Sequence, residues 1–255
     1  MASLESKCNP DMDETKEAKQ KWIDSAPAWI ADMRKGDLNR THLLDSVLLK
    51  LAGDVSGHKV IDIGCGEGRF SRMLADGGAE VTGIDLTGPL IEEARKLQPE
   101  GRYYEASAEE LPFANSSFDL AVSYLVLIDV PDFRLAIKEM VRVVRPGGRI
   151  LAANLNSFVS TASGWHRDSE RKKLHYPVDQ YFEERPLRLE WAGISILNWH
   201  RPLEAYMTAY LKEGLILRHF LEPQPTEAAI ADQPKMADGA RIPYFNVMVW
   251  EKPHS

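Results

Sequence analysis

The sequence predicts a doubly wound α/β fold, in which helices cover both faces of a mostly parallel sheet. Two observations lead to this prediction. Apolar runs of strand length alternate with helical patterns from residue 58 to residue 155, which is the order that βαβ units require. The first of these strands also runs directly into a glycine-rich loop at residues 64–68 that opens a helix, as in ligand-binding turns of this fold.

The segment before the first strand is expected to be partly disordered. Residues 1–20 are polar and acidic without apolar periodicity, so we expect a disordered arm there. Ordered structure is expected to begin near Trp22, and residues 21–255 then form one domain. Apolar side chains recur at helical spacing over residues 22–33 and 42–51. The pattern therefore predicts two helices before the first strand.

The alternating elements follow in a regular order. Strands are predicted at residues 58–63, 80–85, 102–106, 118–124 and 149–155, with helices between them at 69–75, 89–97 and 133–144. The last of these helices is expected to stop at Arg145-Pro146-Gly147-Gly148, because proline and glycine interrupt helices. The crossovers between parallel strands are expected to be right-handed.

Residues 156–200 break this alternation, because they are more numerous than a single crossover needs and are rich in aromatic side chains. We interpret the segment as a lid inserted between the fifth and sixth strands. Its aromatic residues either enclose a mostly apolar or aromatic small molecule or form a lid core packed on the sheet. These residues are Trp165, Tyr176, Tyr181 and Trp199. The last elements are predicted to be a helix at 203–212 and strands at 215–221 and 244–250.

Composition narrows the class of protein. A chain of 255 residues with 44% apolar and 27% charged residues is typical of a globular protein that folds without disulfides. Cys8 and Cys65 lie far apart, and no apolar leader is visible, so a cytoplasmic location is expected. Residues 120–130, the most apolar stretch, are too few to cross a bilayer. The net charge of −7 produces no field that favours nucleic acid.

The glycine-rich loop indicates which kind of ligand the fold binds. Its sequence is Asp62-Ile63-Gly64-Cys65-Gly66-Glu67-Gly68, and Arg69 stands where a dinucleotide-binding loop has its last glycine. Glycines allow a ligand to approach the backbone closely or supply a positive φ. Asp62 would repel a pyrophosphate but accept a hydrogen bond from the ammonium of an amino-acid-bearing cofactor. A nucleotide-dependent oxidoreductase is therefore disfavoured.

Asp85 ends the second strand, 21 residues after Gly64. A carboxylate at this place can accept hydrogen bonds from both ribose hydroxyls of a bound nucleoside. Taken singly, Asp62 or Asp85 could instead be a turn or helix-capping carboxylate. Their joint placement around the glycine-rich loop favours a site for a nucleoside that carries an amino acid.

Three motifs then occur in the order in which one family has them. They are Asp-x-Gly-Cys-Gly-x-Gly from Asp62, Ala-Glu-x-Leu-Pro-Phe from Ala108 and Arg-Pro-Gly-Gly from Arg145. In these motifs the chain resembles class I S-adenosylmethionine-dependent methyltransferases, over residues 59–155. The resemblance implies a Rossmann-like sheet of seven strands with the last strand antiparallel. It also implies S-adenosylmethionine as the cofactor and S-adenosylhomocysteine as the product formed from it.

The resemblance assigns residues to the cofactor site. Leu86 would cover one face of the adenine, and Ala108 and Glu109 would border its edge. Ser107 stands where many relatives have an aspartate that accepts from the adenine amino group. Asp129 would face the methyl acceptor. The complete set of predicted cofactor residues is Asp62, Gly64, Cys65, Gly66, Asp85, Leu86, Ala108, Glu109, Tyr124 and Leu125.

Candidates for the chemistry are fewer. Methyl transfer is an in-line displacement, so alignment and desolvation can make a dedicated base unnecessary. Where a proton must leave the acceptor, histidine is suited to take it. The candidate catalytic residues are His166, His200 and Asp129, with His175 as a further histidine of the same segment. Each histidine could instead be a packing residue. Asp129 could instead cap the helix that begins near Pro131.

The predicted function is transfer of a methyl group from S-adenosylmethionine to an O, N or C nucleophile of a small molecule. Asn154 and Asn156, at the exit of the fifth strand, are candidates to orient a polar acceptor. The alternatives are an RNA or protein methyltransferase and a non-catalytic module that binds S-adenosylmethionine or S-adenosylhomocysteine. No metal site is expected, because the histidines are scattered and no Cys-x-x-Cys occurs. No membrane partner is expected, and the oligomeric state stays open.

Overall fold

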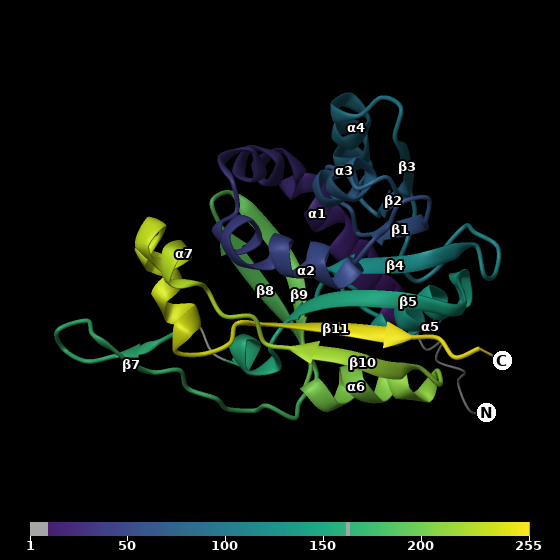
Figure 1. The fold of residues 1–255 in the computed structure, drawn as a ribbon. Helices are drawn as coiled ribbons and strands as arrows, with labels where there is room; N and C mark the ends of the chain where they lie inside the picture. Colours follow the sequence, from purple (N-terminus) through teal and green to yellow (C-terminus); the bar gives the residue numbers. More distant parts are fainter. Residues whose placement is uncertain (1–9, 162–163, 255) are drawn as a thin grey trace, which may run out of the picture.

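A seven-stranded sheet forms the centre of the protein, in the strand order β10-β11-β5-β4-β1-β2-β3 (Figure 1). The computed structural model describes residues 10–161 and 164–254, so Cys8 lies outside the described residues. The strands of the sheet are β1 (Lys59–Ile63), β2 (Glu80–Asp85), β3 (Arg102–Glu105), β4 (Phe118–Tyr124), β5 (Val144–Leu155), β10 (Ile216–Leu221) and β11 (Phe245–Glu251).

The strand directions confirm the predicted doubly wound sheet. Neighbouring strands from β3 to β5 pair in parallel, whereas β11 pairs antiparallel with both β5 and β10. The last strand of the chain, β11, therefore lies between β5 and β10 in the sheet. The central strands β1 and β4 are almost continuously buried, as expected for parallel strands covered on both faces.

Helices cover both faces of the sheet. They are α1 (Pro10–Lys35), α2 (Asp45–Ala52), α3 (Arg69–Asp76), α4 (Gly88–Leu97), α5 (Phe133–Val143), α6 (Leu203–Lys212) and α7 (Glu227–Asp232). A π-helical turn precedes α2 at Arg40–Leu44, and 3₁₀ turns lie at Ser157–Thr161 and Pro234–Ala240. The predicted helix before the Arg-Pro-Gly-Gly motif ends at Val143, one residue earlier than expected.

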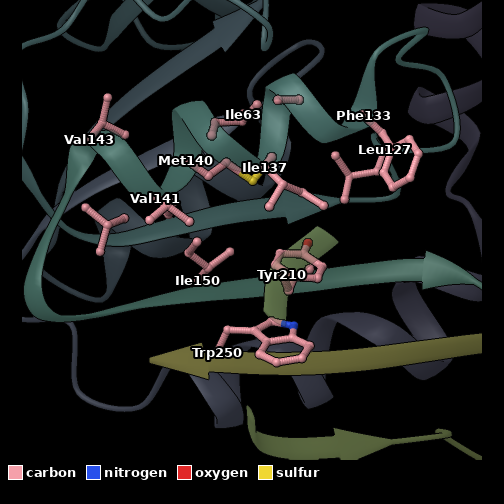
Figure 2. Close-up of a cluster of buried hydrophobic side chains, with 14 of the residues drawn as sticks. Ile63, Leu127, Phe133, Ile137, Met140, Val141, Val143, Ile150, Tyr210 and Trp250 are labelled. Carbon is pink, nitrogen blue, oxygen red and sulfur yellow. The ribbon is translucent and has the colours of Figure 1, made fainter. Parts of the chain in front are cut away.

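One core packs under α5 and α6. Figure 2 shows Phe133, Ile137 and Met140 of α5 over the sheet, with Tyr210 of α6 beside Trp250 of β11. The Tyr210 and Trp250 rings stack with centroids 4.8 Å apart. A second core on the opposite face joins α2 and α3 to β1, β4, β5 and β11. The two cores hold the carboxyl ends of the parallel strands in fixed positions relative to one another.

The N-terminal helix begins earlier than the sequence predicts. The expected disorder of residues 1–20 is wrong for residues 10–20, which form the first part of α1, while residues 1–9 lie outside the described residues. Ala18 is only 2% exposed because it packs against Leu197 and Trp199. This partner surface lies almost 180 positions away in the sequence, so no local pattern reveals it.

Residues 156–200 form hairpins between β5 and α6. The short strands β6 (His166–Arg167) and β7 (Lys173–His175) pair with each other, as do β8 (Arg185–Trp191) and β9 (Ile194–His200). In Figure 1 the segment with β7 extends away from the sheet, whereas β9 packs against α1. The function of this insertion as a lid stays a prediction.

Candidate functional site

A cleft of about 760 Å³ lies at the carboxyl ends of β1, β2 and β4, where doubly wound sheets bind their ligands. An adjoining cavity, also bordered by Gly64 and Gly66, includes Asp62 and Cys65 in its wall. The structure thus brings all the predicted cofactor residues to one place. Those in the wall of the larger cleft are Gly64, Gly66, Asp85, Leu86, Ala108, Glu109, Tyr124 and Leu125.

The glycine-rich loop has a backbone that other residues rarely adopt. Gly64, Gly66 and Gly68 have φ values of +67°, +57° and +77°, in the region where a side chain is strained. A Cβ at Gly64 would also lie 2.4 Å from Cγ2 of Val126. Positive φ and close approach together explain why this loop needs glycine and why it leaves a smooth cradle at the floor of the cleft.

Asp85 is held by the backbone on both sides of its carboxylate. Its Oδ2 accepts a hydrogen bond from the Gly66 N–H at 2.9 Å, and its Oδ1 accepts one from the Thr87 N–H at 2.8 Å. Burial raises the pKa of Asp85, and these two N–H groups oppose the rise. Each carboxylate oxygen accepts more than one hydrogen bond, so the fixed carboxylate retains capacity for the two hydroxyls of a ribose.

Asp62 lies deeper, with only 1% of its surface exposed. The Ser71 hydroxyl donates to its Oδ2 at 2.6 Å. Burial raises the pKa of Asp62 to about 7, with a smaller contribution from the negative charges of Asp85 and Glu67, although the Ser71 hydrogen bond lowers it. A positive group bound nearby would reverse this effect, because it favours the ionised carboxylate. Asp62 therefore suits the ammonium of an amino-acid-bearing ligand.

This raised pKa leads to a prediction of proton release. We expect S-adenosylmethionine to bind more tightly as the pH rises from 6 to 7 and to displace roughly half a proton from Asp62 at pH 7, because the bound cation lowers the pKa of the carboxyl group. Calorimetric titrations in two buffers of different ionisation enthalpy measure the release. Adenosine, which has no amino acid, is the matched ligand control. Equal proton release by the Asp62→Asn variant would contradict the assignment.

Three residues that no motif marks also line the cleft: Trp22, Trp29 and Arg40. The Trp22 and Trp29 rings meet edge to face, with centroids 5.2 Å apart. Their spacing of seven residues placed them on one face of a predicted helix, but that pattern is equally typical of a core-facing helix. Only the position of α1 over the cleft distinguishes the two possibilities.

Arg40 is the one cation among the described residues that line the larger cleft. Its guanidinium lies over the rings of Trp29 and Tyr124, 5.1 and 5.4 Å from their centroids. Nη1 also donates to Asp37 Oδ2 at 2.8 Å. Arg40 also lines the adjoining cavity together with Asp62, so a guanidinium and a buried carboxyl group border one space. This arrangement is complementary to the carboxylate and ammonium of a free amino acid.

Arg69, which replaces the last glycine of a dinucleotide-binding loop, has a structural contact. Its guanidinium donates to both oxygens of Asp45, at 2.7 and 2.8 Å. The Tyr124 hydroxyl donates to the same carboxylate at 3.0 Å. These hydrogen bonds tie the start of α3 and the end of β4 to α2, and they hold Tyr124 in the wall of the cleft.

At the predicted adenine edge, Ser107 and Glu109 bind each other. The Glu109 N–H donates to Ser107 Oγ at 3.1 Å, and the Glu109 carboxylate accepts from the Asp132 N–H at 2.8 Å. Burial raises the pKa of Glu109. The loop after β3 is therefore fastened to the start of α5, and Ser107 lines the cleft where many relatives have aspartate.

Asp129 lines the cleft and is half-buried. Burial raises its pKa well above the usual range, and the Asn198 side-chain amide donates to its carboxylate. The alternative that Asp129 caps α5 is wrong, because Asp132 occupies the cap and accepts from the Leu135 N–H at 2.9 Å. Asp129 is therefore the candidate catalytic residue that the structure places beside the cofactor residues.

The two candidate histidines lie elsewhere. Both ring nitrogens of buried His200 have partners, at 2.7 Å from Ser160 Oγ and 2.8 Å from the Tyr181 carbonyl. His166 is exposed and packs beside His175, with ring centroids 4.9 Å apart and ring planes tilted by 31°. Neither is among the described residues that line the cleft. The placement of His166 and His200 therefore argues against the predicted role as base.

Two of the predicted lid aromatics also pack away from the cleft. Trp165 donates through Nε1 to the Tyr244 hydroxyl at 2.7 Å, and Tyr176 lies edge to face against Trp165 with centroids 5.8 Å apart. The aromatic side chains that line the cleft are instead Trp22 and Trp29 of α1 and Tyr124 of β4. The alternative of a lid core agrees better with the contacts of Trp165 and Tyr176.

Comparison with known proteins agrees with this site. Residues 61–152 match the family model described as a methyltransferase domain. The malonyl-[acyl-carrier protein] O-methyltransferase of Pseudescherichia vulneris is 42% identical over 120 residues, 47% of this chain and 45% of that protein. The protein of the same name from Erwinia billingiae is 39% identical over 149 residues, 58% and 55% of the two chains. The matches thus span about half the length of these curated relatives.

The structural comparison extends over most of the chain. The crystal structure of an S-adenosylmethionine-dependent methyltransferase from Mesorhizobium loti has a TM-score of 0.75 and 27% identity, covering 85% of this chain and 98% of that one. The chain is therefore similar to S-adenosylmethionine-dependent methyltransferases, and residues 61–152 match the methyltransferase domain. The predicted fold and S-adenosylmethionine as the cofactor are thereby confirmed. The individual cofactor contacts stay predictions.

Two features are absent from the described part of the methyltransferase, residues 10–161 and 164–254. No group of three or more His, Cys, Asp or Glu side chains is arranged there to hold a metal ion. None of the described helices is long and apolar enough to span a membrane.

Proposed function

We propose that this protein transfers a methyl group from S-adenosylmethionine to a small-molecule acceptor. The observation that carries the proposal is the carboxylate of Asp85, fixed by the N–H groups of Gly66 and Thr87 beside a glycine cradle at the carboxyl edge of the sheet. Trp22 and Trp29 of α1 line the same cleft, which supports an acceptor small enough to enter beneath a helix. The proposal includes the cytoplasmic location expected from the low cysteine content.

The residues around the cleft fit the cofactor. The absence of a side chain at Gly64 lets Val126 pack against the loop, and Asp62 and Arg40 line one cavity, where they are proposed to bind the ammonium and the carboxylate of the donor. S-Adenosylmethionine supplies an electrophilic methyl group on a sulfonium, which a nucleophile displaces in line. The carboxyl and guanidinium groups orient the donor, and this alignment contributes much of the rate.

Other residues exclude water and handle protons. Leu86, Val126 and Trp29 form apolar walls of the cleft, which strengthens the electrostatic interactions inside it. Where the acceptor must lose a proton, the Asp129 carboxylate is the group proposed to receive it, because its raised pKa makes it more basic than an exposed aspartate. An acceptor that is already anionic needs no such transfer.

Label transfer tests this function. The protein is incubated with methyl-labelled S-adenosylmethionine and a cell extract, which is then separated into small molecules, RNA and protein. We expect label among the small molecules that depends on active protein and is lost with Asp85→Ala, because that variant lacks the ribose-binding carboxylate. Label confined to RNA or protein would contradict the small-molecule acceptor. Tight S-adenosylhomocysteine binding without label in any fraction would favour the non-catalytic binding module.

A further inference from the structure

A second cavity, of about 990 Å³, lies between the end of β5, the 3₁₀ turn at Ser157–Thr161, the β8–β9 hairpin and α6. We call it the hairpin chamber. Ile128, Leu155 and Leu187 give it an apolar wall. Asn198 also lines it and donates to Asp129, which lines the donor cleft. The hydrogen bond between Asn198 and Asp129 therefore connects the wall of the hairpin chamber to the wall of the donor cleft.

Two hydroxyl groups in the wall of the hairpin chamber are buried without a partner. Ser157 and Tyr206 are 5% and 3% exposed, and neither hydroxyl has a hydrogen-bond partner in the described part of the chain. The Tyr206 hydroxyl lies near the Arg201 guanidinium, which lowers the pKa of Tyr206 against the effect of burial. A buried polar group without a partner is costly, so hydroxyls left over in a cavity wall indicate a polar ligand group.

The hairpin chamber is also positively charged. Arg185, Arg188 and Arg201 line it, and no Asp or Glu occurs among its described lining residues. Arg188 is paired with Glu17 outside the chamber. Arg201 is 2% exposed, and its nearest carboxylate oxygen, on Glu184, is 4.0 Å away.

The hydrogen bonds of Arg201 involve no carboxylate, and its ion pair with Glu184 is long, at 4.0 Å. They go to the backbone carbonyls of Leu127, Val130 and Pro131 at 2.7–2.8 Å. Carbonyl oxygens satisfy the N–H donors without cancelling the positive charge, and a charge in low dielectric acts strongly on its surroundings. A negatively charged ligand group is therefore favoured in the chamber over a neutral or positive one.

We propose that the hairpin chamber binds the methyl acceptor and that this acceptor is an apolar molecule carrying a carboxylate. The proposal rests on the proposed function, since it places the acceptor beside the donor cleft. The apolar wall packs against the hydrocarbon part of the acceptor, and the Ser157 and Tyr206 hydroxyls donate hydrogen bonds to its carboxylate. The positive charges of the arginines attract the same carboxylate. The lack of a histidine among the described residues of the donor cleft agrees with an acceptor that has no proton to lose.

Binding of three probes of equal chain length tests the charge preference. Decanoate, decan-1-ol and decylamine are titrated into the complete protein by calorimetry, with and without S-adenosylhomocysteine. We expect decanoate to bind at least tenfold more tightly than decan-1-ol, and decylamine to bind most weakly. Equal or tighter binding of decylamine, or no binding of decanoate, would overturn the proposal.

Variants test the two hydroxyls. Tyr206→Phe and Ser157→Ala are each expected to weaken decanoate binding about tenfold, as expected for loss of a hydrogen bond to a charged group. Tyr210→Phe is the matched control, because Tyr210 lies one turn further along α6 with an equally unpartnered hydroxyl but does not line the chamber. Unchanged decanoate affinity in Tyr206→Phe and Ser157→Ala would overturn the assignment.

S-Adenosylhomocysteine titrations separate this proposal from the proposed function. Loss of decanoate binding in the variants with intact S-adenosylhomocysteine affinity supports an acceptor chamber distinct from the donor cleft. Failure of the wild-type protein to bind S-adenosylhomocysteine would contradict the proposed function whatever decanoate does.

Discussion

Replacing Asp85 with alanine is expected to weaken S-adenosylhomocysteine binding by about two orders of magnitude. Hydrogen bonds to a charged group contribute about 1.5–3 kcal/mol each, and the proposed contact with the ribose comprises two of them. The lower end of this range, about 3 kcal/mol for the two bonds, corresponds to a rise in Kd of slightly more than about a hundredfold. Isothermal titration calorimetry of the purified variant measures this change, and its thermal unfolding shows whether the fold is retained.

A ligand control separates the ribose contact from damage to the loop. Asp85 also binds the N–H groups of Gly66 and Thr87, so its removal can shift the glycine-rich loop. Adenosine and 2′,3′-dideoxyadenosine differ only in the hydroxyls that the carboxylate is proposed to bind. We expect the wild-type protein to prefer adenosine strongly and Asp85→Ala to bind the two almost equally. If the preference survives in the variant, the ribose does not contact Asp85.

Replacing Gly64 with alanine is expected to lower the free energy of unfolding by about 2–5 kcal/mol and to impair S-adenosylhomocysteine binding. The positive φ of +67° costs a residue with a Cβ about 1–2 kcal/mol. The new Cβ would also lie 2.4 Å from Val126 Cγ2, and such overpacking costs about 1–3 kcal/mol. Urea unfolding followed by tryptophan fluorescence measures the change.

Two further variants separate the causes. Gly36 has a φ of +89°, but a Cβ added there would meet nothing within 4 Å, so Gly36→Ala should cost only the backbone strain. Adding Val126→Ala to Gly64→Ala should recover part of the loss, because it removes the atoms that the new Cβ meets. If Gly64→Ala is no more destabilising than Gly36→Ala, close approach to Val126 is not what requires glycine.

The donor half of the site was predictable because its determinants are local in sequence. Positive φ at Gly64 and Gly66 depends on a few consecutive residues, and β alternation brings Asp62 and Asp85 to the ends of adjacent strands. Parallel pairing then places these strand ends at one edge of the sheet. The loop, the two aspartates and the order of strands therefore follow from patterns that span fewer than thirty residues.

The acceptor half was not predictable in the same way. His166 and His200 were candidates by residue type. In the structure, both ring nitrogens of His200 are hydrogen-bonded, to Ser160 and to the Tyr181 carbonyl, and His166 lies on an exposed hairpin. No sequence motif identified Arg40 as a residue of the site, because its position in the cleft depends on how the segment before α2 packs over Tyr124 of β4.

The structure of residues 10–20 was also not predictable from local sequence. Their polar composition is typical of a disordered arm, yet Ala18 is buried because β9, from the other end of the chain, provides a surface for it. Helices in proteins are stabilised mainly by packing of one face rather than by their own propensity. The sequence alone determined the elements and the donor loop, whose causes are short-range. The tertiary structure decided what covers the cleft and where an acceptor can lie, since those depend on contacts between distant segments.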